Sequence, residues 1–115
     1  ACSFCREFGI DENEMFRIAE GFGLGMGVME MCGALSGMAM IIGLSNSRGN
    51  TEEGSGSKGD TYKKLRTYIQ KFKEKNGSCI CRELKGVETG KVLCSCPQCI
   101  TDAVALTEEY LAENR

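Results

Sequence analysis

The residues best suited to chemistry in this chain are its cysteines. The 115-residue sequence contains eight cysteines and no histidine, so thiolates are its only strong ligands for soft metals and its main redox groups. Two cysteines open the chain, one stands alone in an apolar segment, and five crowd into residues 79–99. The eight positions are Cys2, Cys5, Cys32, Cys79, Cys81, Cys94, Cys96 and Cys99. Function is therefore to be sought at sulfur.

The absence of histidine excludes several classes of protein. Zinc hydrolases of the His-Glu-x-x-His type, Ser-His-Asp triads and Cys-His pairs all need an imidazole. A c-type haem needs Cys-x-x-Cys-His. The chain has 14 basic and 16 acidic residues, a formal net charge of -2, so it lacks the basic excess that neutralises phosphates. We expect no nucleic-acid partner.

The length predicts a single domain spanning residues 1–115, which buries about two-thirds of the surface of its unfolded chain. A domain of this size does not need disulfide staples. The first residues show no basic-then-apolar leader, which favours a cytoplasmic protein. The apolar stretch 28–44 contains Glu30 and is shorter than the roughly 20 residues that cross a bilayer, so no membrane insertion is expected.

The N-terminal region predicts a short first helix and a longer second one. Gly9 suits the left-handed position after a helix, and the helix before it is cut short, which indicates truncation at the N-terminus. Asp11 is a cap for the next helix, with Glu14 reaching back as in a capping box. One apolar face of that helix combines Met15, Phe16, Ile18, Ala19 and Phe22.

Residues 21–27 alternate glycine with Phe22, Leu24 and Met26. This pattern predicts a tight glycine-rich turn whose apolar side chains are buried. A phosphate-binding loop is disfavoured, because no strand precedes the segment and no Gly-Lys-Ser/Thr follows it.

A long apolar helix is predicted from Val28, with Cys32 in its middle and Cys32, Leu35, Ala39 and Ile42 along one side. Gly33 and Gly37 would form a groove where a neighbouring helix or an inorganic cluster can approach closely. Composition alone favours Cys32 as a core residue, whereas the glycine groove beside it favours a functional one.

The second half of the chain predicts a mobile loop at 45–59 and three further helical segments. Asp60-Thr61 would cap a helix that ends at Asn76-Gly77, and its lysines and arginines would form a solvated face. Its inward face is expected to hold Tyr62, Leu65, Ile69 and Phe72.

A short helical turn closed by Gly86 and a last helix beginning at Cys96-Pro97 complete the pattern. The inward face of the last helix is expected to hold Ile100, Ala103, Val104, Thr107 and Leu111. No alternating strand is present. The sequence therefore predicts an all-α fold, a small bundle of about four to five helices.

The C-terminal cysteines form two kinds of motif. Cys96-Pro-Gln-Cys99 opens a helix, where free amides and the helix dipole stabilise a thiolate, so it suits a redox dithiol or half of a metal site. Cys79-Ile-Cys81 and Cys94-Ser-Cys96 could bring four sulfurs together for tetrahedral zinc or an iron–sulfur cluster. In the other interpretation, one cysteine of each pair is a ligand and its neighbour is a small buried hydrophobe.

Three motifs in order resemble a known family. Cys32-Gly-Ala-Leu-Ser-Gly37, Cys81-Arg-Glu-Leu-Lys-Gly86 and Cys96-Pro-Gln-Cys-Ile are similar to the redox-active family named for its C, GCAxxG, C, C cysteine pattern, from Phe4 onward. The resemblance implies an all-helical domain in which Cys32, Cys81 and Cys96 converge from three helices. It also implies iron–sulfur binding and a fourth cysteine in the first helix.

The sequence departs from this family pattern at both ends. In the family's register the first cysteine falls just upstream of Ala1, so Cys2 and Cys5 are substitutes for it or unrelated to it. The pattern does not require three other cysteines, which are Cys79, Cys94 and Cys99.

We therefore expect a cytoplasmic redox protein with a cysteine-ligated metal centre, favoured to be iron–sulfur, for electron transfer to a partner protein. Cys32, Cys81 and Cys96 would be ligands, and Gly33 and Gly37 would admit the centre. Further ligands would come from Cys2, Cys5, Cys79, Cys94 or Cys99.

Three alternatives stay open. Without metal, the same sulfurs could form a dithiol/disulfide switch in which Cys99 resolves Cys96. A structural zinc knot within residues 79–99 would leave Cys32 merely packed. A secreted, disulfide-bonded protein is the third alternative. A homodimer could cover apolar surface that the truncated first helix exposes.

Overall fold

The all-α fold predicted from the sequence is confirmed. The computed structural model describes residues 1–47, 49, 52, 54 and 56–114, and within them it contains helices and no strand. The α-helices are α1 (Glu12–Ala19), α2 (Gly33–Asn46), α3 (Lys58–Asn76), α4 (Cys81–Lys85) and α5 (Cys96–Asn114). Three short or irregular helical turns are η1 (Cys5–Phe8), η2 (Glu20–Phe22) and η3 (Gly25–Met29).

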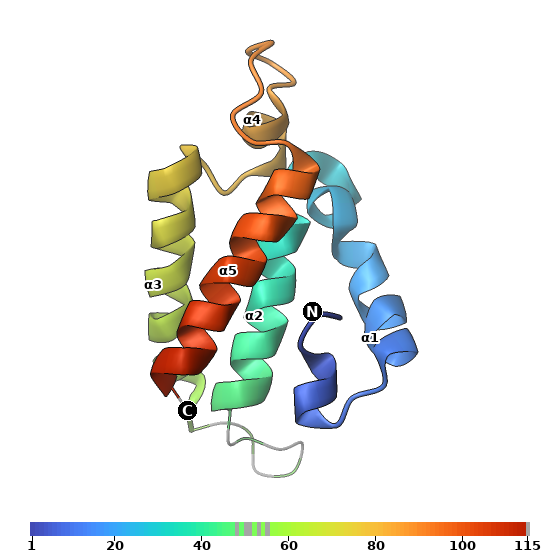
Figure 1. The fold of residues 1–115 in the computed structure, drawn as a ribbon, viewed down its shortest axis with the longest axis vertical. Coiled ribbons are helices and arrows are strands. Elements are labelled where there is room, and N and C mark those ends of the chain that lie inside the picture. The colour runs from blue at the N-terminus through green and yellow to red at the C-terminus, as the bar shows by residue number, and fades with distance from the viewer. Residues whose placement is uncertain (48, 50–51, 53, 55, 115) are drawn as a thin grey trace.

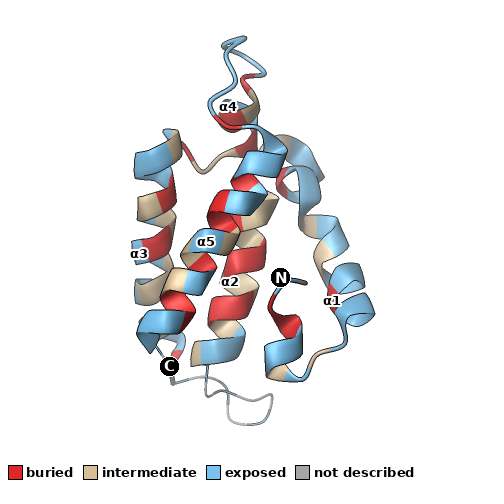
Figure 2. Ribbon diagram, viewed as in Figure 1, coloured by how far each residue is buried: buried red, intermediate tan, exposed pale blue. Residues whose placement is uncertain are grey.

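The three long helices α2, α3 and α5 pack side by side and enclose the core (Figure 1). α2 is largely apolar and carries no charged residue, so most of its sides can be buried against neighbours (Figure 2). The rings of Tyr68 on α3 and Tyr110 on α5 meet edge to face, with centroids 5.5 Å apart. The largest fully buried side chains are Leu35, Ile41, Ile42, Phe72, Leu84 and Tyr110.

A buried carboxylate also joins α3 to α5. Asp102, only 4% exposed, accepts hydrogen bonds from Lys75 (2.7 Å), Gln98 (2.8 Å) and Asn76 (3.2 Å). Lys71 pairs with Glu109 across the same interface. The lysines of α3 were expected on a solvated face, but these two bind the neighbouring helix.

Most predicted helix ends are confirmed. The Asp11 side chain accepts from the Glu14 amide at 3.0 Å, as predicted for the cap of α1. Gly9, Gly77 and Gly86 take the left-handed conformation after η1, α3 and α4, with φ of 73°, 86° and 69°. α5 begins at Cys96.

The start of α3 differs from the prediction. The helix begins at Lys58, so Asp60 lies inside its first turn. The Asp60 carboxylate instead accepts from the Asn46 side chain at 3.1 Å, which ties α3 to the end of α2. Part of the predicted mobile loop at 45–59 lies outside the described residues, namely residues 48, 50, 51, 53 and 55, and its two ends belong to α2 and α3.

The predicted inward faces are too wide. Met15, Phe72 and Ala103 are buried as predicted, but several other residues assigned to those faces are exposed. The exposed ones are Phe16, Ile18, Tyr62 and Ile100. α1 lies at the edge of the bundle, and Met15 is its one buried residue, so much of its apolar face is exposed (Figures 1 and 2).

The long helix predicted from Val28 is wrong in its first part. α2 begins at Gly33, and Cys32 is the residue before its first turn. Met31 forms an antiparallel bridge with Ile80, and the Cys32 amide donates to the Cys79 carbonyl at 2.9 Å. These long-range bonds hold residues 31–32 extended, so the helix begins at Gly33 and not at Val28.

The glycine-rich turn exists, but its side chains are not buried as expected. Leu24, Met26 and Met29 have positive φ of 53°, 62° and 60°, a conformation in which non-glycine residues are strained. Leu24, Met26 and Val28 are exposed. Elsewhere, none of the helices that the structure describes is long and apolar enough to cross a bilayer.

Candidate functional site

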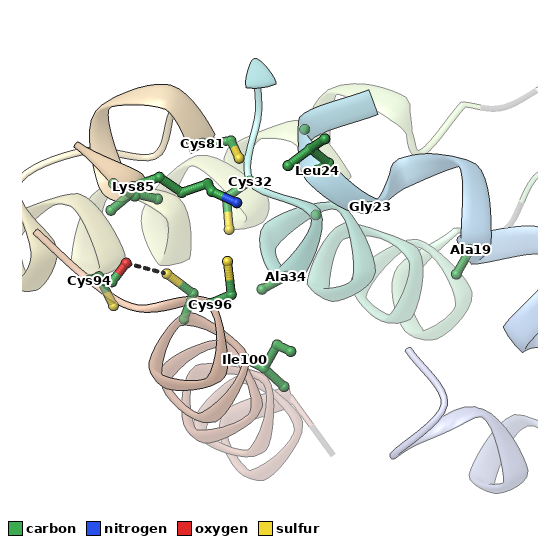
Figure 3. Close-up of a pocket in the computed structure, with 14 residues that line it drawn as sticks. Ala19, Gly23, Leu24, Cys32, Ala34, Cys81, Lys85, Cys94, Cys96 and Ile100 are labelled. Atoms are coloured by element: carbon green, nitrogen blue, oxygen red, sulfur yellow. Dashed lines mark hydrogen bonds between the residues drawn. The ribbon is translucent and has the colours of Figure 1, made fainter. Parts of the chain in front are cut away.

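A cavity of about 260 Å³ lies at the end of the bundle where α2 and α5 begin (Figures 1 and 3). Five cysteines from three separate stretches of the chain line it: Cys32, Cys81, Cys94, Cys96 and Cys99. The rest of the described lining is apolar or glycine except for Lys85. The site is therefore a sulfur-rich pocket with one cationic side chain.

Backbone contacts fix Cys32 at the start of α2. Its carbonyl accepts from the amides of Leu35 (3.0 Å) and Ser36 (3.1 Å), which closes the first turn. A Cβ on Gly33 would lie 2.7 Å from the Phe22 carbonyl oxygen, so only glycine allows the chain to pass this close. Residues 23–25, which follow Phe22, thereby become one wall of the cavity.

Cys81 opens α4 on the opposite wall. Its amide donates to the Glu30 carbonyl, and a Cβ on Gly25 would lie 2.9 Å from the Cys81 Cβ. Lys85 follows one helical turn later, and its ammonium lies among the sulfurs in Figure 3.

The remaining three cysteines come from the loop before α5 and from its first turns. The Cys94 amide donates to the Leu84 carbonyl at 3.2 Å, which holds this loop against α4. The Cys99 thiol donates to the Cys94 carbonyl at 3.8 Å (Figure 3). Cys94 and Cys99 are buried, whereas Cys96 is exposed at the mouth of the cavity.

The thiols of the site influence one another. Burial raises the pKa of Cys81, Lys85 lowers it, and the neighbouring Cys32 and Cys96 raise it further. The three sulfurs that the family pattern singles out therefore share one electrostatic environment.

The pKa of Cys99 is raised far above its usual range. Burial is the main cause, followed by its hydrogen bond with Cys94 and by the electrostatic influence of the neighbouring Cys32. Cys99 is thus held as a thiol, although the helix start was expected to favour thiolate. A bound metal ion would reverse this preference, because it displaces the proton.

The other three cysteines lie outside the cavity lining. The Cys2 thiol approaches the Glu12 carbonyl at 3.9 Å, and the buried Cys5 thiol approaches the Cys2 carbonyl at 3.5 Å. Cys79 packs half-buried against the core. All eight cysteines are free thiols.

The two glycines of the predicted groove have different surroundings. Gly33 lines the cavity. A Cβ on Gly37 would instead lie 3.1 Å from the Ala1 nitrogen, so the chain's own N-terminus occupies the space beside it.

The donor set suits a thiolate-ligated metal centre. It consists of soft sulfur donors with no histidine or carboxylate among them, the set that iron–sulfur clusters and structural zinc use. Among the described residues, no group of three or more potential ligands is already arranged to hold a metal ion. The five cysteines therefore suit a thiolate-ligated metal centre, because sulfur is the right kind of donor and because they all line one cavity.

Among the lining residues that sequence reasoning missed, two bear directly on Cys81, namely Gly25 and Lys85. Lys85 carried a usable signal, because it stands four residues after Cys81 in a predicted helical turn and so shares its face. Gly25 carried none, since its contact with Cys81 depends on how the two segments fold together.

Comparison with known families gives one match. The family model described as "Putative redox-active protein (C_GCAxxG_C_C)" matches residues 1–110. No curated protein and no solved structure matches the chain.

Proposed function

The chain belongs to the C_GCAxxG_C_C family of redox-active proteins, and on that premise we propose that its cysteine cavity holds an iron–sulfur cluster for electron transfer. The observation that carries the proposal is the gathering of five cysteines from three stretches of the chain around one cavity.

Cys32, Cys81 and Cys96 would be ligands, and Cys94 or Cys99 would complete the set. A bound cluster supplies one-electron chemistry. The chain's own contribution is to hold the sulfurs at the ends of α2, α4 and α5. Leu24, Leu84 and Ile100 give the cavity apolar lining, and around its buried thiols the surroundings are less polar than water, which raises the energetic effect of nearby charges.

Cys32 and Cys99 are both buried and line the same cavity, and this neighbourhood favours a second function, thiol/disulfide exchange. Oxidation would join these two sulfurs, and the two electrons and two protons released would reduce a disulfide of a partner to two thiols. This pair differs from the Cys96–Cys99 pair expected from the CxxC motif.

Anaerobic reconstitution with iron and sulfide tests the leading proposal. The wild-type protein should bind both elements in matching amounts, turn brown, and give an electron paramagnetic resonance signal in one of its oxidation states. Cys32→Ala and Cys81→Ala should lose most of the iron. Cys2→Ala is the matched control, because Cys2 lies outside the cavity, and it should keep the cluster.

Two results would contradict the cluster. A colourless protein that binds zinc alone would support a structural zinc site. A Cys32→Ala variant with unchanged iron content would show that any metal binds among residues 79–99 without Cys32.

A further inference from the structure

Lys85 is the only charged side chain among the described residues that line the cysteine cavity. The other lining residues are the five cysteines and small or apolar residues. Lys85 is half-buried, and an ammonium group that has lost part of its water is stabilised by a neighbouring anion.

Lys85 has no such partner within the described part of the chain. The five ion pairs found there use other cations, namely Arg6, Lys64, Lys71, Lys75 and Arg82. Lys85 also donates no side-chain hydrogen bond to any described residue. Its positive charge acts instead on the sulfur of Cys81.

The local fold holds this ammonium toward the sulfurs. Lys85 is the last residue of α4, one turn after Cys81, and Gly86 closes the helix with φ of 69°. A Cβ on Gly86 would lie 2.4 Å from the Lys91 carbonyl oxygen, so the next loop packs tightly onto the helix end. Figure 3 shows the Lys85 side chain extending over the cavity beside Cys32.

We propose that Lys85 is an anion-binding residue of the cysteine cavity, which compensates the negative charge of the group bound among the sulfurs. The inference rests on the proposed function for the identity of that group, a thiolate-ligated cluster with net negative charge. In the apoprotein the same ammonium attracts small anionic reagents to the thiols.

The first test uses the apoprotein and two alkylating agents, anionic iodoacetate and neutral iodoacetamide. Both react with the thiolate, so the ratio of their rates at Cys81 does not depend on how much thiolate is present. Lys85→Gln should lower the iodoacetate-to-iodoacetamide ratio at Cys81 by about fivefold, from the loss of one attractive charge close by. Peptide mass spectrometry assigns the rates to individual cysteines.

Three further variants control this test. Lys85→Arg keeps the charge and should keep the ratio, whereas Lys85→Met should lower it as Lys85→Gln does and guards against a folding defect in one variant. Lys91→Gln removes a charge from the adjacent exposed loop and should leave the ratio unchanged. An unchanged ratio in both neutral Lys85 variants, or an equal loss in Lys91→Gln, would overturn the proposal.

The second test uses the reconstituted protein. Lys85→Gln should shift the one-electron equilibrium of the cluster toward its oxidised, less negative state by about tenfold, which corresponds to a potential about 59 mV lower. Lys85→Arg should stay near the wild type. An equal potential in Lys85→Gln and wild type would contradict charge compensation. If no cluster forms at all, the proposed function fails while the alkylation ratio still decides the role of Lys85.

Discussion

Gly25 shows how much a single residue without a side chain contributes to the cavity. It has φ of +57°, and a Cβ there would lie 2.5 Å from the Glu30 nitrogen and 2.9 Å from the Cys81 Cβ. Gly27, two residues later in the same turn, has φ of +75° but open space around its Cβ position. Comparing an alanine at Gly25 with one at Gly27 therefore distinguishes the cost of a positive φ from the cost of a steric clash.

We expect Gly25→Ala to destabilise the protein more than Gly27→Ala. Gly27→Ala should cost roughly 1–2 kcal/mol, the penalty of an L-residue in the left-handed region. Gly25→Ala should cost about 1–3 kcal/mol beyond that, because backbone atoms must also move. Urea denaturation measures both, and equal losses would contradict the contact with Glu30 and Cys81.

The same residues show what the sequence could reveal. The resemblance to the family predicted that Cys32, Cys81 and Cys96 converge, and these three line one cavity. Lys85 could also have been predicted as a site residue, because it stands four residues after Cys81 in a predicted helical turn. The place of Gly25 did not follow from any local pattern, because the neighbour that requires glycine lies in a different segment.

At the scale of elements, local signals predicted helix ends well and tertiary bonds decided the exceptions. Asp11, Gly77 and Gly86 act within one turn of their own helices, so their sequence context was sufficient. The start of α2 depends on the Cys79 carbonyl, which accepts from the Cys32 amide. The apolar pattern around Val28 contains no information about a hydrogen-bond partner that lies so far along the chain, so it could not predict this helix start.

The contact between α3 and α5 depends on Asp102, and we expect its removal to be costly. Asp102→Asn should destabilise the protein by about 1–3 kcal/mol, because Lys75 and Gln98 would lose a charged acceptor. Glu109→Gln breaks an exposed pair between the same helices and should cost less than about 1 kcal/mol. Thermal or urea unfolding compares the two, and similar losses would contradict a special role for the buried carboxylate.

The pH dependence of stability tests Asp102 independently. Burial would raise the pKa of its carboxyl, but hydrogen bonds from Lys75, Gln98 and Asn76 outweigh this and lower it. A group with a lowered folded-state pKa stabilises the protein above its unfolded pKa, about 3.9 for aspartate, and this contribution is lost as the pH falls through the folded value. Below about pH 4, wild type should therefore lose more stability than Asp102→Asn. Parallel acid-unfolding curves would contradict this assignment.

At the scale of the whole molecule, the cavity and the hydrophobic core are continuous. Cys32, Cys94 and Cys99 line the cavity and also belong to the cluster of buried core residues. A chemical change at these sulfurs, such as binding of a metal centre, would therefore affect the packing of α2 against α5 directly.

This continuity predicts that cluster binding stabilises the entire fold. A ligand present at 100 times its dissociation constant adds about 2.7 kcal/mol, and each kcal/mol raises the Tm of a domain of this size by roughly 4 °C. Anaerobic calorimetry should therefore show a Tm about 10 °C higher for the loaded protein than for the apoprotein. Cys81→Ala treated in the same way should show no increase, and equal Tm values for loaded and apo wild type would contradict the coupling.

Because Cys32, Cys94 and Cys99 belong both to the cavity lining and to the core, few substitutions could remove their thiols without disturbing the fold. Substitution by larger or charged residues would disrupt the helix packing, and serine would bring a hydroxyl that needs a new partner in the dry interior. A descendant without this chemistry would need a small apolar residue such as alanine at these three sites, whereas the exposed position 96 would tolerate a wider range of substitutions.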